Sequence, residues 1–134
     1  MVAIEGGLKS KTGEIFNEFP DRLSDVLILV SAGYSITSVS WARDLGWAAA
    51  ILAVLTAYVR AFGGLVGTSQ YFCGPMAKSQ RMAVMTAACL SAALEISMGW
   101  NLYAMTLALG VIVAGSVMTI IRRTILIVRD LESR

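Results

Sequence analysis

The 134-residue sequence contains no histidine and only two cysteines, Cys73 and Cys89. Zinc sites are built mainly from cysteine and histidine, and a cysteine nucleophile is usually activated by a histidine base. The missing histidine therefore excludes a Cys/His zinc site and a Cys–His catalytic pair. Because free cysteine is among the most buried residue types, we expect both cysteines to be packing residues.

Charged side chains are also scarce, and this scarcity indicates the class of protein. They make up 15% of the chain, against about a quarter in an average soluble domain, whereas 57% of the residues are hydrophobic. The formal net charge of +2 is too small to indicate a nucleic-acid partner. The composition instead predicts an integral membrane protein, and 134 residues fall within the usual size of one domain.

Four long apolar stretches predict helices that cross a membrane. They cover residues 26–42, 45–61, 82–100 and 102–121. Each contains about 17 to 20 residues, enough to cross a hydrocarbon core with little slack. Residues 62–80, with four glycines and Pro75, form the one long connection, and we expect tight turns near Arg43 and Asn101. The prediction is an all-α integral membrane helical bundle with about four transmembrane helices in a single domain, residues 1–134.

Positive charge is distributed unevenly around these stretches. Four crossings place both termini and the long connection on one side, which holds ten basic residues, whereas only Arg43 lies on the other. Such a bias marks the cytoplasmic side of a membrane protein. We therefore expect a bacterial inner membrane protein with both termini in the cytoplasm. The ten residues are Lys9, Lys11, Arg22, Arg60, Lys78, Arg81, Arg122, Arg123, Arg129 and Arg134.

An acidic series precedes the first apolar stretch. Asn17, Asp21 and Asp25 follow Gly13 at intervals of four residues. On a helix, each of these side chains is turned by about 40° from the one before, so they share one face. Hard oxygen ligands of this kind suit Mg²⁺ or Mn²⁺. The alternative is a solvated helix start, where acids interact favourably with the positive end of the helix dipole.

The spacing of this series resembles that of a known family. Class-I CDP-alcohol phosphatidyltransferases have the signature D-x2-D-G-x2-A-R-x8-G-x3-D-x3-D, and its second half is matched in register by Ala3, Gly13 and Asp21. Ile4 stands in place of the arginine and Asn17 in place of the third aspartate. The resemblance implies that the four helices are the last four of six. It also implies an N-terminally truncated family domain, with the D-x2-D-G half and about two more spans encoded directly upstream.

The activity implied by the resemblance is phospholipid biosynthesis. A phosphatidyl group passes from a CDP-linked lipid to an alcohol acceptor, whose identity is left open, and CMP is released. Asp21 takes the position of the fourth aspartate, the implied general base, and Asn17 and Asp21 are the implied ligands of Mg²⁺ or Mn²⁺. The resemblance is compatible with a homodimer, and membrane lipids are the other expected partners.

A phosphate-handling enzyme also needs fixed cations. Arg60, Lys78 and Arg81 lie at the cytoplasmic ends of the second and third stretches, and we expect them to bind substrate together with Gly13 and Asp25. The alternative for the three cations is ordinary anchoring, which requires basic residues at these same ends. The remaining basic residues near the C-terminus are expected only to anchor the chain and to contact anionic lipids. These are Arg122, Arg123, Arg129 and Arg134.

Glu95 is an acid inside the predicted third span, and an intramembrane carboxylate is a functional candidate by default. It lies far from the acidic series, so we expect a structural role. A rival function remains open, a small four-helix proton-coupled transporter that uses Glu95. A third alternative is an inactive structural remnant of the transferase, favoured by Asn17 and by the absent D-x2-D-G half.

Overall fold

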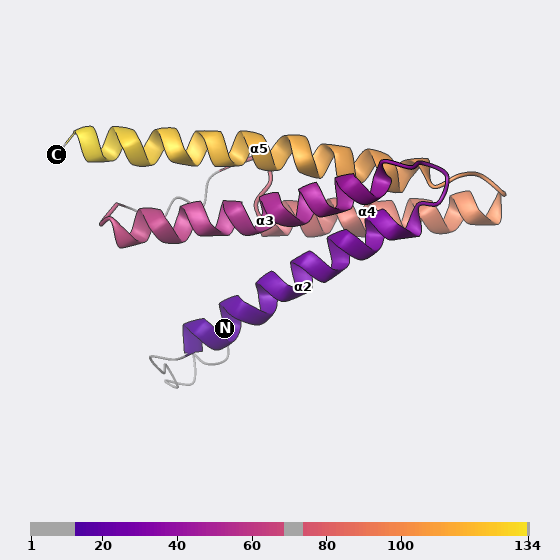
Figure 1. Cartoon of the computed structure of the whole chain (residues 1–134), viewed down its shortest axis with the longest axis horizontal. Coiled ribbons are helices and arrows are strands. Elements are labelled where there is room, and N and C mark those ends of the chain that lie inside the picture. The colour runs from indigo at the N-terminus through magenta and orange to yellow at the C-terminus, as the bar shows by residue number, and fades with distance from the viewer. Residues whose placement is uncertain (1–12, 69–73, 134) are drawn as a thin grey trace.

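The computed structural model describes residues 13–68 and 74–133, and these residues form four helices and no strand, so the prediction of an all-α fold is confirmed for them. Successive helices run in opposite directions along the long axis of the molecule (Figure 1). The helices are α2 (Gly13–Ser35), α3 (Ala42–Leu65), α4 (Lys78–Ser97) and α5 (Tyr103–Glu132).

Two of these helices are long and apolar enough to cross a membrane by length and composition, namely α3 and α5. The helix bounds also correct the sequence-based turns. The first apolar stretch is broken after Ser35, and Arg43 lies in the first turn of α3 rather than in the preceding connection. The long connection is shorter than expected because α3 continues to Leu65. The last helix, α5, also extends beyond its predicted apolar stretch, to Glu132.

The turn near Asn101 is confirmed, and its geometry explains why α4 ends where it does. Gly99 has a φ of +71°, a left-handed conformation that glycine adopts without steric cost. The amide of Trp100 donates to the carbonyl of Glu95 at 2.8 Å, and that of Gly99 to the carbonyl of Ile96 at 3.1 Å. This is the Schellman arrangement, which satisfies the last carbonyls of a helix and reverses the chain.

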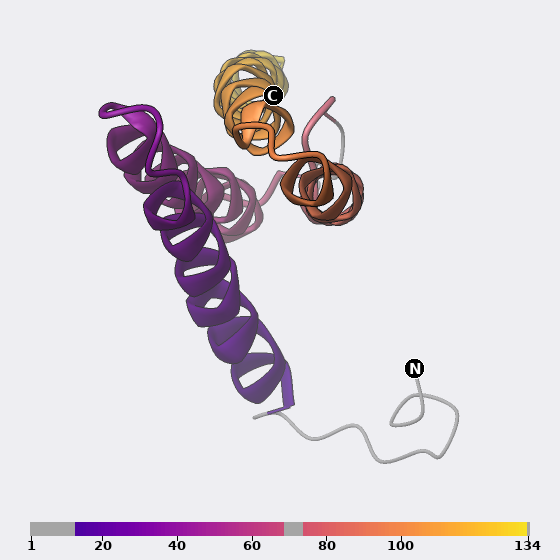
Figure 2. The same ribbon diagram turned by 90° about the vertical axis from the view of Figure 1, so that its right-hand side faces the viewer.

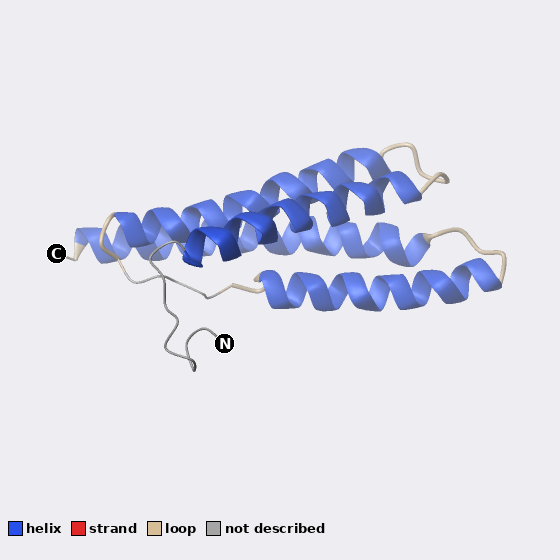
Figure 3. Cartoon of the chain, turned by 90° about the horizontal axis from the view of Figure 1, so that it is seen from below, coloured by secondary structure: helices blue, strands red, loops and turns tan. Residues whose placement is uncertain are grey.

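The helices pack as a chain of neighbours, α2 on α3, α3 on α5 and α5 on α4. Figure 3 shows the bundle from below, and the end view in Figure 2 shows α2 leaning away from the others. The α2–α3 contact is very close: a Cβ placed on Gly46 would lie 2.9 Å from the carbonyl oxygen of Leu29 and 3.0 Å from the Cα of Gly33. Small residues at a helix crossing permit this approach.

Candidate functional site

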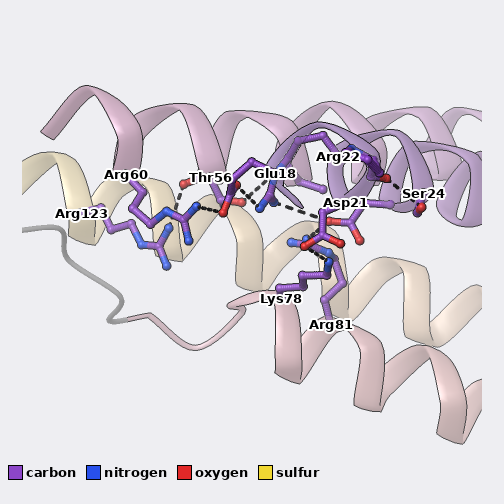
Figure 4. A network of polar contacts seen from close by, with 12 residues as sticks. Glu18, Asp21, Arg22, Ser24, Thr56, Arg60, Lys78, Arg81 and Arg123 are labelled. Carbon is purple, nitrogen blue, oxygen red and sulfur yellow. Dashed lines mark hydrogen bonds and ion pairs between the residues drawn. The ribbon is translucent and has the colours of Figure 1, made fainter. Parts of the chain in front are cut away.

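Charged residues from all four helices line a cavity at one end of the bundle. Its volume is about 590 Å³, and it lies where the first half of α2 faces the C-terminal part of α3, the start of α4 and the second half of α5 (Figure 4). The alternating helix directions bring these segments together. The charged lining residues are Glu18, Asp21, Arg22, Arg60, Lys78, Arg81 and Arg123.

Asp21, the expected general base, lies at this cavity in an ion pair with Lys78. The Lys78 Nζ atom is 2.5 Å from the Asp21 Oδ2 atom, and both side chains are partly exposed. The hydrogen bond from Lys78 lowers the pKa of the Asp21 carboxyl below its ordinary value, and the charges of Lys78 and Arg22 add to this against an opposing effect of burial. Asp21 is therefore ionised at neutral pH.

Glu18 is a member of the site that the sequence analysis did not identify. Its carboxylate accepts hydrogen bonds from Arg22 at 2.7 Å and from Arg60 at 2.8 Å, so it connects α2 to α3. Burial raises the pKa of Glu18, but these hydrogen bonds and the charges of the two arginines outweigh burial, and the pKa lies below its ordinary value. The four-residue spacing of Glu18 and Arg22 was the signal available in the sequence.

Asp25 is enclosed, in contrast to the expectation that it contacts substrate. The Arg81 Nη2 atom lies 2.5 Å from its Oδ2 atom, and both side chains are almost completely buried. Arg22 approaches the same oxygen at 3.7 Å. A buried carboxylate needs a cation and hydrogen bonds to offset its lost hydration. Arg81 thus lines the cavity and also neutralises Asp25 behind it.

Arg123 corrects the expectation that it is only an anchor. It is buried, and its Nη1 atom donates a hydrogen bond of 2.8 Å to the backbone carbonyl of Thr56 on α3. This hydrogen bond links α5 to α3. Arg122 and Arg129, by contrast, are exposed on α5. Helical spacing alone does not reveal which of two adjacent arginines faces the bundle.

The expected site residues are only partly brought together. Asp21, Arg60, Lys78 and Arg81 surround one cavity. Gly13 is exposed at the first residue of α2 and does not line the cavity. Asn17 belongs to α2, but its side chain lies outside the described part of the structure, as do Ala3, Ile4 and Cys73 entirely.

The described residues do not test the expected Mg²⁺ or Mn²⁺ site, because the side chain of Asn17 lies outside them. Within residues 13–68 and 74–133, no group of three or more acidic, cysteine or histidine side chains is arranged to hold a metal ion. Glu18, Asp21 and Asp25 are each paired with a cation. Five cations against these three carboxylates leave the cavity positively charged. A phosphate group is attracted to such surroundings.

Glu95, for which a structural role was expected, contacts the backbone at the start of α5. Both of its carboxylate oxygens accept from the backbone amide of Ala104, at 3.1 and 3.3 Å, in the first turn of α5. The residue before α5, Leu102, provides no side-chain cap, so Glu95 satisfies an amide that would otherwise lack a partner within the helix. A carboxylate at this end also interacts favourably with the helix dipole.

No protein-family model, curated protein or solved structure matches this chain.

Proposed function

We propose that the chain belongs to the integral membrane CDP-alcohol phosphatidyltransferases, and that the cavity binds phosphate groups of its substrates. The observation that supports this most is the juxtaposition of Asp21 with five cations around about 590 Å³. Arginine offers a planar pair of donors to phosphate oxygens and lysine a compact charge. The family resemblance places a proton acceptor at this same aspartate.

The proposal places all four helices in a membrane, with the cavity at its cytoplasmic surface. The apolar character of α3 and α5 supports this placement. Large apolar side chains are exposed on every helix, among them Leu27, Ile51, Leu90 and Leu107. An outward apolar surface of this kind is stable against lipid and unfavourable in water. A lipid headgroup at the surface would lie at the depth of the cavity.

In the proposed reaction, the hydroxyl oxygen of the acceptor forms a bond to the β-phosphorus of the CDP-linked lipid. The bond from that phosphorus to the CMP oxygen breaks, and CMP leaves with the electron pair. Asp21 accepts the hydroxyl proton, while Arg60, Lys78 and Arg81 stabilise negative charge on the phosphates. By the resemblance, Asn17 and Asp21 would hold Mg²⁺ or Mn²⁺, which would supply further stabilisation of charge on the phosphates.

Release of CMP from a CDP-linked lipid tests the proposal. The protein is expressed from its gene with any upstream coding sequence, and membranes are supplied with CDP-diacylglycerol and a panel of acceptors: glycerol phosphate, inositol phosphate and serine. Asp21→Asn has the same shape but accepts a proton poorly, so we expect a loss of about a hundredfold or more. Asp44→Asn, an exposed acid in the first turn of α3, is the matched control and should be unchanged.

The outcomes separate the alternatives. Unchanged CMP release from Asp21→Asn would contradict the assignment of the base. No CMP release with any acceptor would refute transfer activity and favour the inactive remnant. The proton-coupled transporter requires an exchangeable Glu95, whereas its carboxylate is bound to the backbone of Ala104.

A further inference from the structure

The first turn of α4 presents two cations to two carboxylates of α2, and the two ion pairs differ sharply in burial. Lys78 and Asp21 are 39% and 38% exposed. Arg81 and Asp25, one turn further along, are 1% and 3% exposed. The main packing partner of α4 is α5. The two ion pairs connect α4 to α2 as well.

The difference in burial decides in which of the two pairs the cation can separate from its carboxylate. Separating an exposed pair shifts an equilibrium by no more than about fivefold. Removing one partner of a buried pair leaves a charge without hydration, a shift of more than about a hundredfold. A ligand of ordinary affinity can therefore separate Lys78 from Asp21, whereas Arg81 stays with Asp25.

The sequence at the start of α4 provides neither a side-chain cap for the free backbone amides nor an acid to interact with the helix dipole. Lys78 is the first residue of the helix, where the positive end of the dipole disfavours a cation, and the first turn has no acidic residue. Ala77 provides no side-chain cap. The buried Nε atom of Arg81 has no hydrogen-bond partner among the described residues, although Arg81 lines the cavity. These features together favour an anion at this position.

We propose that Lys78 exchanges partners: Asp21 holds it in the ligand-free protein, and a phosphate group that enters the cavity takes it over while the Arg81–Asp25 pair stays closed. The phosphate replaces the Asp21 carboxylate as the anion beside the start of α4. Asp21 is thereby released only when phosphate is bound. Lys78 is a phosphate-binding residue in this scheme. The scheme rests on the proposed function for its account of why the carboxylate is released.

A double-mutant cycle on phosphate binding tests the exchange. The full chain in detergent micelles is titrated with inorganic phosphate near pH 7.5, and binding is followed by calorimetry. Asp21→Asn removes the competing carboxylate and should tighten binding by up to about fivefold. Lys78→Met should weaken binding by about tenfold, the value of a charge-assisted hydrogen bond. In the double variant, Asp21→Asn should no longer tighten binding.

Two further variants sharpen the result. Lys78→Arg keeps the charge and should retain the coupling to Asp21, which a merely structural role of Lys78 would not require. Asp44→Asn, at the other end of the bundle, should leave affinity unchanged. Circular dichroism of each variant establishes that it is folded.

Opposite outcomes would overturn the exchange. Binding that weakens or does not change in Asp21→Asn contradicts it, as does tightening of equal size with and without Lys78, which would indicate only a general field effect. Absence of phosphate binding by the unaltered protein also overturns it. The cycle uses no CDP-linked lipid, so coupling without CMP release would refute the proposed function alone. CMP release without coupling would refute the exchange alone.

Discussion

Loss of the Arg81 guanidinium should be among the most damaging single changes to a charged side chain of this bundle. Arg81→Met removes the partner of a buried carboxylate, since Arg81 and Asp25 are paired at 2.5 Å on α4 and α2. Breaking a buried pair from one side costs about 3 to 5 kcal/mol of unfolding free energy. Arg22 lies 3.7 Å from the same Asp25 oxygen and compensates in part. We therefore expect about 3 kcal/mol, the lower end of that range.

Two companion variants isolate the cause. Asp25→Leu combined with Arg81→Met removes both charges, and the double variant should recover to within about 1 kcal/mol of the unaltered protein, because apolar replacement of a buried pair is often neutral. Lys78→Met removes a cation from the same turn, but from an exposed pair, and should cost less than about 1 kcal/mol.

The measurement is equilibrium unfolding in mixed micelles, followed by the far-ultraviolet circular dichroism of the helices. The expected order of destabilisation is Arg81→Met, then Lys78→Met and the double variant together. If Arg81→Met and Lys78→Met were equally mild, burial would not control the cost of these pairs. A double variant as unstable as Arg81→Met would show that the lost packing of the arginine side chain, rather than the unpaired Asp25 charge, is responsible.

Three other predictions concern different parts of the fold. Gly46→Ala places a Cβ 2.9 Å from a backbone oxygen of α2, so the same unfolding assay should show a loss of about 1 to 3 kcal/mol. Glu95→Ala removes the acceptor for the Ala104 amide and should cost about 1 kcal/mol, with no effect on phosphate binding. The pKa values of Asp21 and Glu18 lie below their ordinary 3.8 and 4.5, so the stability from their pairs is complete above pH 4.5 and lost as pH falls below these values. Asp21→Asn should flatten part of this acid transition.

The sequence alone determined the helical class of the described chain and the approximate number of helices. Apolar stretches of about 17 to 20 residues cannot be strands of ordinary length, and the glycines and Pro75 mark the long connection. The gathering of five described basic residues around one cavity agrees with the count of charges, because successive antiparallel helices return every second boundary to the same end. Local composition is sufficient for these properties, since each depends on neighbouring residues only.

Tertiary structure decided the partners of the charged groups. Asp21 and Asp25 are four residues apart on one helix face, yet one is half exposed beside Lys78 and the other is enclosed by Arg81. Arg122 and Arg123 are adjacent, yet only the second is buried against α3. Which side chain faces a cavity depends on the rotation and tilt of each helix against its neighbours. Those are set by close contacts such as that of Gly33 with Gly46, between residues that no local pattern relates.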